Sequence, residues 1–138
     1  MSYNLSNSYP AINFSHGFNQ AKTFSFLKSI KSNSLLTICI AGKNNIAVEG
    51  LDFVLKHFSQ NTNICFLPNP CDDGSDGWQL SYKRFARHHE VPEVTIQMLY
   101  DIENLLFVSL EYSQLIKTAN FLTDKLFNLH FSLLPKYK

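Results

Sequence analysis

The sequence predicts an α/β protein with a Rossmann-like, open and mostly parallel sheet that carries helices on both faces. Two observations lead to this fold class. Short apolar runs of strand length recur along the chain, for example at residues 35–41 and 105–110. Segments with helical spacing lie between several of these runs, and strands that alternate with helices form parallel βαβ units with right-handed crossovers.

The first half of the chain contains the clearest elements. The run at residues 35–41 is apolar apart from Thr37, which is typical of a strand buried on both faces. Apolar residues between Ile46 and Phe58 recur at roughly helical spacing, which predicts a helix. Residues 63–67 form a second apolar strand. Residues 68–77 are rich in turn-forming residues and predict a loop.

The second half continues the alternation less regularly. We expect a helix over residues 78–89, a brief strand at 91–96 despite its proline, and an apolar strand at 105–110. A short helical segment at residues 120–124 leads into a last strand at 126–131. Ligands bind open α/β sheets outside the carboxyl ends of the strands, so the segments that follow the strands are expected to converge on one crevice.

The length of 138 residues suits one globular core. Residues 1–34 are rich in serine and asparagine, and we interpret them as an extension outside the main domain. Disorder, a docked short helix and a mis-assigned start codon all stay open for this extension. Residues 35–138 are expected to form the domain itself.

Charge and composition exclude several classes of function. The formal net charge of +1 gives no electrostatic argument for a nucleic-acid partner. No apolar run approaches the roughly 18 residues that cross a bilayer, and the N-terminus lacks the signal-peptide pattern. We therefore expect a cytoplasmic protein without membrane contact. Three cysteines without a C-x-x-C pair indicate neither a disulfide framework nor a zinc site, and no metal is expected.

The most informative motif is the string at residues 128–138. It sets Asn128 and His130 two positions apart on a strand, so both side chains point to one face while Leu129 faces the other and can be buried. A loop pinned by Pro135 follows. The pair alone is a weak signal, because a single strand histidine is more often structural than catalytic. The whole pattern N-x-H-x-S-L-L-P-x-Y-K is specific.

This string resembles the formyltransferase family that uses 10-formyltetrahydrofolate, which includes glycinamide ribonucleotide, methionyl-tRNA and nucleotide-sugar formyltransferases. Residues 40–48, 72–79 and 109–112 look like segments of the nucleotide-sugar N-formyltransferases. Those enzymes act on dTDP-linked 4-amino-4,6-dideoxyhexoses in lipopolysaccharide or O-antigen biosynthesis. The resemblance covers residues 35–138.

The resemblance implies transfer of a formyl group from 10-formyltetrahydrofolate to the amine of a nucleotide-linked deoxyaminosugar. A glycinamide ribonucleotide or methionyl-tRNA formyltransferase is the alternative, as is a non-catalytic remnant that only binds ligand. By the family pattern, His130 is the base or the oxyanion partner, and Asn128 positions the formyl group. Donors of this kind are needed because the tetrahedral intermediate carries a negative oxygen.

The resemblance also implies binding residues. The predicted cofactor-binding residues are Leu110, Glu111, Tyr112, Gln114, Ile116, Leu133, Pro135 and Tyr137. The predicted substrate-binding residues are Gly42, Lys43, Asn44, Trp78 and Gln79.

Some of these residues have a simpler structural interpretation. The turn after Gly42 presents backbone N–H groups suited to phosphate, but it matches no dinucleotide or P-loop pattern, and a plain turn with an exposed lysine fits equally well. Leu110 fits a buried strand as well as an apolar wall of a pterin site. Trp78 is favoured as a core residue over a substrate-lining one.

The family's third catalytic residue, an aspartate farther along the chain, has no counterpart before Lys138. We therefore expect a chain truncated within the N-terminal catalytic domain and inactive, or nearly so, as given. The family commonly dimerises through parts beyond this chain, which implies a homodimer for the full-length form.

Overall fold

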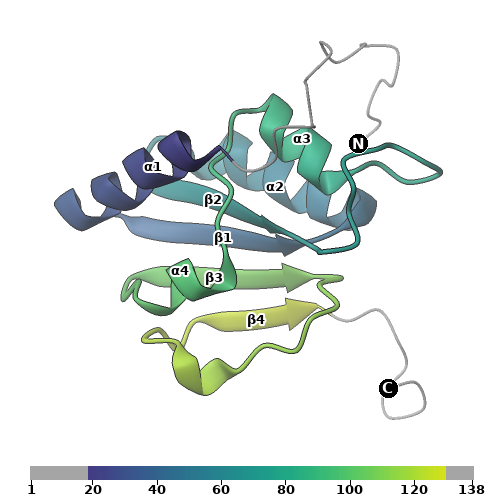
Figure 1. The fold of residues 1–138 in the computed structure, drawn as a ribbon. Coiled ribbons are helices and arrows are strands. Elements are labelled where there is room, and N and C mark those ends of the chain that lie inside the picture. The colour runs from purple at the N-terminus through teal and green to yellow at the C-terminus, as the bar shows by residue number, and fades with distance from the viewer. Residues whose placement is uncertain (1–18, 130–138) are drawn as a thin grey trace.

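The computed structural model describes residues 19–129 of the chain. Within this range four strands form one parallel sheet in the order β2-β1-β3-β4, with helices on both faces (Figure 1). The strands are β1 (Leu36–Gly42), β2 (Thr62–Pro68), β3 (Leu105–Leu110) and β4 (Leu126–Leu129). The helices are α1 (Gln20–Ser32), α2 (Asn44–Phe58), α3 (Tyr82–His88), α4 (Ile96–Tyr100) and the 3₁₀ turn η2 (Thr118–Asn120). The predicted Rossmann-like fold is confirmed.

Strand β1 is central and separates the two halves of the core. Its side chains alternate between the faces of the sheet. Ile38 and Ile40 pack in the cluster that α2 and α3 cover, whereas Cys39 and Ala41 pack in the cluster that α1 and α4 cover. The strand is therefore buried on both faces, as its continuous apolar run predicted.

The registers of the three strand pairs bring all carboxyl ends to one edge of the sheet. Gly42 pairs with Pro68 of β2 and with Leu110 of β3, and Leu110 pairs with Leu129 of β4. A Cβ atom on Gly42 would lie only 2.0 Å from the carbonyl oxygen of Leu110. The close approach of β1 and β3 at this edge therefore requires glycine.

Part of the N-terminal segment is a helix packed on the sheet. Phe26 of α1 is only 9% exposed and joins the core cluster of β1 and α4. The Thr23 hydroxyl donates a hydrogen bond of 2.7 Å to the carbonyl of Glu93. Of the possibilities left open for residues 1–34, a docked helix is the one found for residues 20–32. The domain boundary there stays a prediction.

Helix α3 begins at Tyr82 rather than at Trp78, so the predicted start of this helix was wrong. The hydroxyl of Ser81 caps the helix by accepting the N–H of Arg84 at 3.0 Å. Trp78 is 92% exposed, so its interpretation as a core residue was also wrong. The core position belongs to Tyr82, which is fully buried and donates from its hydroxyl to the carbonyl of Ile40 at 2.7 Å.

The brief strand expected at residues 91–96 is not formed. A single parallel bridge links Glu93 to Phe66, and helix α4 already begins at Ile96. Pro92 has no N–H to donate to a strand ladder, and only its carbonyl takes part, accepting the N–H of Phe66 at 3.0 Å. The proline therefore limits this segment to an isolated contact.

Strand β4 forms the outer edge of the described sheet. It follows η2, which lies at residues 118–120 rather than at the expected 120–124. Phe127 and Leu129 are 58% and 53% exposed on the face that carries α2. The alternation of side chains allowed Leu129 to be buried, but the structure places it in the exposed part of this strand.

Acid sensitivity is expected from His89, the residue that caps the C-terminus of α3. Burial lowers its pKa below the ordinary value, His88 and Lys56 lower it further, and Asp52 acts in the opposite direction. The folded protein thus binds this proton less readily than the unfolded chain. The free energy of unfolding should fall as the pH drops below about 6.5, the pKa of an unperturbed histidine.

The measurement is the melting temperature at about pH 7.5 and about pH 5.5, on either side of that pKa. The decrease between the two values should be smaller in His89→Gln than in the wild type. Equal decreases would show that other groups cause the acid sensitivity.

Candidate functional site at the carboxyl edge of the sheet

Three loops meet at the carboxyl edge of the sheet, where the arrowheads of the strands end in Figure 1. They are the turn after β1 at residues 43–45, the loop after β2 at 69–81 and the segment after β3 at 111–116. Side-chain hydrogen bonds join each of these loops to another. The convergence of strand ends predicted from the sequence is therefore found for these three.

A cavity of about 120 Å³ lies between the turn after β1 and the loop after β2. The predicted substrate-binding residues Lys43, Asn44 and Gln79 all line it. The Gln79 side-chain oxygen accepts the N–H of Asn45 at 3.2 Å, and the Asn45 side-chain oxygen accepts the N–H of Leu80 at 2.8 Å. These two hydrogen bonds fasten the end of the loop to the first turn of α2.

The other two predicted substrate-binding residues lie elsewhere. Gly42 is buried beneath the cavity, between β1 and β3, and its contribution is the close contact of the two backbones. The side chain of Trp78 is in solvent and is not part of the cavity wall. Asp72 and Asp73 of the acidic loop also line the cavity. Sequence reasoning missed four further lining residues, namely Cys71, Ser75, Leu80 and Ser81.

The acidic loop before α3 has a structural role that its composition did not indicate. Asp72 accepts hydrogen bonds from the Ser81 hydroxyl at 2.6 Å and from the N–H of Lys83 at 2.8 Å. Asp76 accepts the N–H of Ser81 at 2.8 Å and pairs with Arg84 at 3.6 Å. These two carboxylates therefore hold the N-terminus of α3. No cluster of three potential metal ligands occurs within residues 19–129.

A larger cavity of about 320 Å³ lies beside β3 and β4. The predicted residues Tyr112, Gln114, Ile116 and Asn128 line it together. Asn128 pairs with Ser109 of β3, so both side chains share the face of the sheet on which the cavity opens. The predicted catalytic amide thus lies in one cavity with three predicted cofactor-binding residues.

Two further observations concern the wall of this cavity. Burial raises the pKa of Tyr112, and its hydroxyl, which is protonated near neutral pH as in any tyrosine, can donate a hydrogen bond. Ser109 is 2% exposed and is a polar residue inside an otherwise apolar strand. That interruption was the sequence signal that could have identified Ser109 as part of the site.

Leu110 and Glu111 are placed differently from the cavity residues. Leu110 is 4% exposed and packs under α2, where a Cβ atom on Gly50 would come within 2.5 Å of its methyl group, so the buried-strand interpretation is the one found.

Glu111 and Asn44 have φ angles of 59° and 65°, a region that non-glycine residues rarely adopt. The Asn44 amide donates to the Glu111 carboxylate at 3.0 Å. Strained backbone of this kind concentrates at functional sites.

Four predicted residues, His130, Leu133, Pro135 and Tyr137, lie outside the described residues. Their predicted roles stay predictions.

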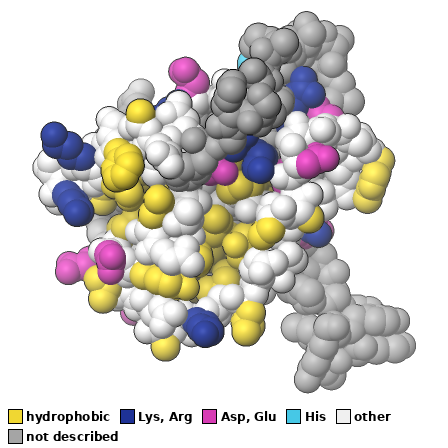
Figure 2. All heavy atoms as spheres, viewed as in Figure 1, with side chains coloured by type: hydrophobic (Ala, Val, Ile, Leu, Met, Phe, Trp, Pro, Cys, Tyr) yellow, Lys and Arg dark blue, Asp and Glu magenta, His cyan; other side chains and the backbone are white. Residues whose placement is uncertain are grey.

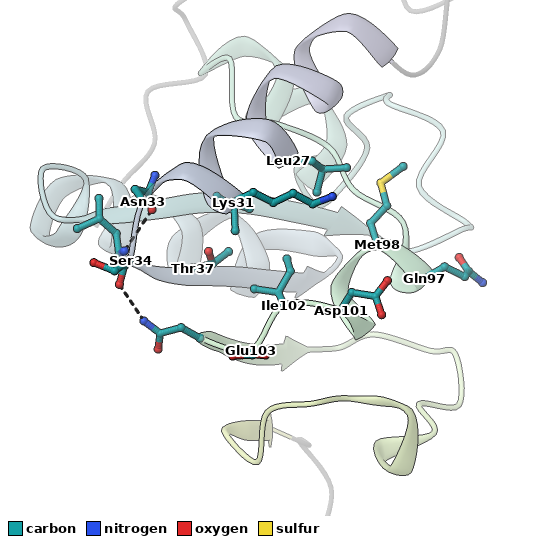
Figure 3. A pocket seen from close by; sticks show the side chains of 13 residues that line it. Leu27, Lys31, Asn33, Ser34, Thr37, Gln97, Met98, Asp101, Ile102 and Glu103 are labelled. Atoms are coloured by element: carbon teal, nitrogen blue, oxygen red, sulfur yellow. Dashed lines mark hydrogen bonds between the residues drawn. The ribbon is translucent and has the colours of Figure 1, made fainter.

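A third cavity of about 960 Å³ lies at the opposite, amino edge of the sheet (Figure 3). Leu27 and Lys31 of α1 form one side of it, and Met98 and Ile102 form the other. Figure 2 shows apolar side chains gathered on this face of the molecule, between α1 and α4. None of the residues predicted to bind ligand lines this cavity.

Two solved structures are similar to this chain. WlaRD, a sugar 3N-formyltransferase crystallised in the presence of dTDP and 5-N-formyl-THF, is 47% identical with a TM-score of 0.68, over 75% of this chain and 38% of that chain. The N-formyltransferase from Helicobacter canadensis in complex with folinic acid and dTDP-3-aminofucose is 39% identical with a TM-score of 0.67, over 73% and 38%. No protein-family model and no curated protein matches the sequence.

The fold and these similarities show that the chain resembles part of a formyltransferase. Within that class, its similarity is to the sugar N-formyltransferases, and the resemblance predicted from the sequence is confirmed. The chain spans 38% of the length of each of the two similar chains. No helix among residues 19–129 has the length and apolar character of a membrane span.

Proposed function

We propose that this chain is part of a sugar N-formyltransferase that moves the formyl group of 10-formyltetrahydrofolate to the amine of a dTDP-linked deoxyaminosugar. The observation that carries the proposal is the pair of cavities at one edge of the sheet, lined by residues predicted for substrate and for cofactor. The similarity to enzymes crystallised with formylated folates and dTDP or a dTDP-sugar supports the same function.

The cavity beside β3 and β4, which is the larger of the two at the carboxyl edge, suits the pterin ring of the folate. Small-molecule sites are concave and mostly apolar, with a few polar groups that fix orientation. Ile116 supplies apolar surface, while Gln114 and the protonated Tyr112 hydroxyl supply hydrogen-bonding groups. The 10-formyl group would then lie toward β4, where Asn128 lines the same cavity.

Formyl transfer needs a donor to the formyl oxygen and an acceptor for a proton. The acceptor amine attacks the formyl carbon, a C–N bond forms, and the bond from that carbon to N10 of the folate breaks, with N10 gaining one proton for the one that the amine releases. The Asn128 amide would donate to the oxygen while it is negative, because fixed donors stabilise such an intermediate. His130, by the family pattern, would take the proton that the amine releases.

The smaller cavity suits the nucleotide-sugar. Lys43 gives its wall a cation, and the first turn of α2 presents backbone N–H groups, both of which favour phosphate. Asp73 gives the wall a carboxylate, which suits the hydroxyl or ammonium groups of an aminosugar. The two cavities together would bring the acceptor amine and the formyl donor to the same edge of the sheet.

The proposal also includes the use of the product, the location of the protein and its oligomeric state. The product would serve lipopolysaccharide or O-antigen synthesis in the cytoplasm, and the full-length protein would be a homodimer. A net charge of +1 argues against a tRNA substrate, because phosphate contacts need clustered lysine and arginine.

The test is incubation of the full-length protein with 10-formyltetrahydrofolate and, separately, dTDP-3-aminofucose, glycinamide ribonucleotide or methionyl-tRNA. Mass spectrometry should detect a formyl group on the sugar nucleotide alone. Formylation of another acceptor would overturn the choice of substrate. Binding of folinic acid without any transfer would favour the ligand-binding remnant, and unchanged transfer by His130→Asn would exclude His130 as the base.

A further inference from the structure

The carboxyl end of β2 carries a buried amide that no motif indicated. Asn69 follows Pro68 and is 1% exposed. Its backbone N–H donates to the carbonyl of Gly42 at 2.8 Å, and its carbonyl accepts the N–H of Asp72 at 3.0 Å. The backbone of Asn69 therefore already joins the end of β1 to the loop that lines the smaller cavity.

The Asn69 side chain reaches the third loop of the site. Its oxygen accepts two hydrogen bonds from Ser113, one from the backbone N–H at 2.7 Å and one from the hydroxyl at 2.8 Å. Its NH₂ group donates to the sulfur of Cys71 at 2.7 Å. One side chain thus connects the segment after β3 with a residue in the wall of the smaller cavity.

The position of Ser113 makes this contact important for the larger cavity. Ser113 lies between Tyr112 and Gln114, and both of these residues line that cavity. The segment is held from one side by Asn44, which bonds Glu111, and from the other by Asn69. Asn69 itself lines neither cavity, so its effect on a ligand must pass through Ser113.

We propose that Asn69 is a positioning residue that fixes residues 112–114 for folate binding and joins the folate side of the site to the nucleotide-sugar side. The inference rests on the proposed function. The buried amide sets the backbone of Ser113, and the two neighbouring side chains then point into the larger cavity at the orientation a pterin requires. Without its acceptor oxygen, the Ser113 N–H would lose its partner and the segment would shift.

The experiment compares Asn69→Leu, which removes both polar groups at similar size, with Asn69→Asp, which retains an acceptor for Ser113. Thr123→Val is the matched control, because Thr123 is 8% exposed and donates to the carbonyl of Leu105 at 2.7 Å near the amino end of β3. Calorimetry gives the Kd of each protein for folinic acid and for dTDP, and thermal melts give the loss of stability.

Asn69→Leu should raise the Kd for folinic acid about tenfold, the factor that corresponds to one net hydrogen bond, with a smaller effect on dTDP. Asn69→Asp should restore most of the affinity. Thr123→Val should bind folinic acid like the wild type despite a similar loss of melting temperature. If Asn69→Leu does not fold, Ser113→Ala takes its place and should raise the same Kd about threefold, since it keeps the backbone hydrogen bond.

Wild-type affinity in Asn69→Leu would overturn the proposal. So would an equal loss of affinity in Asn69→Leu and Thr123→Val, since that result would reflect general destabilisation. A wild-type protein that binds neither folinic acid nor dTDP would instead show that the proposed function is wrong. The wild-type titrations are done first, so this outcome is distinguished from a failure of the proposal for Asn69.

Discussion

Replacing Gly42 by alanine should lower the free energy of unfolding by about 3 kcal/mol, because an extra methyl group has no room at this position. Its Cβ would lie 2.0 Å from the Leu110 carbonyl oxygen and 3.1 Å from the Cβ of Ala47. The first neighbour is backbone of β3 and cannot turn away as a side chain could. The strands β1 and β3 would have to separate at the edge that carries the site.

Urea denaturation measures this change, and Gly77→Ala is the matched control. No atom lies within 4 Å of the position that a Cβ would take on Gly77. The control should therefore alter the free energy of unfolding by less than about 0.5 kcal/mol. Equal effects of the two substitutions would contradict the steric argument. The carbonyl of Leu110 also accepts the N–H of Lys43 at 3.3 Å, so Gly42→Ala should weaken binding of dTDP as well.

Asn128→Ala should reduce the rate of formyl transfer at least about a hundredfold, the usual effect of losing one donor to an oxyanion. The decrease should lie in kcat rather than in KM, because the hydrogen bond would strengthen only as the formyl oxygen becomes negative. The side chain lies at the wall of the larger cavity, opposite Ser109 in the β3–β4 pair. Initial rates of the full-length protein at saturating folate and sugar nucleotide measure the effect.

Leu129→Ala is the control for this substitution. Leu129 is next in the same strand, is 53% exposed and points to the opposite face of the sheet. It should leave kcat within about twofold, since an exposed side chain that does not line the cavity contributes little. If Leu129→Ala lowered kcat as much as Asn128→Ala, the loss would come from a disturbed strand β4 and not from the missing amide.

The parts of the fold that were predicted correctly are those with a strong local pattern. The continuous apolar run of β1 indicated burial on both faces, and the structure places Ile40 and Ala41 in opposite halves of the core. The period-two rule also placed Asn128 on a face apart from Leu129. The family resemblance brought together Tyr112 and Gln114, which do share a cavity.

The parts that were missed depend on contacts between distant residues. The start of α3 is set by the carboxylate of Asp72, which lies in the preceding loop and bonds Ser81 and Lys83. Trp78 is exposed because this capping moves the helix start past it. Asn69 had no signal of its own, since an asparagine after a strand reads as an ordinary turn residue. The role proposed for it comes from its hydrogen bonds to Ser113.

The hydrogen bonds that assemble the site join residues far apart along the chain. Asn44 and Glu111 are 67 positions apart, and Asn69 and Ser113 are 44 positions apart. Loop closure over such separations costs entropy, and contacts of this kind form late in folding. A nascent chain on the ribosome can pair β1 with β2 early, but the cavity beside β3 and β4 is not complete until β3 and the residues after it have emerged. Binding of the folate would then report the last step of folding, not the first.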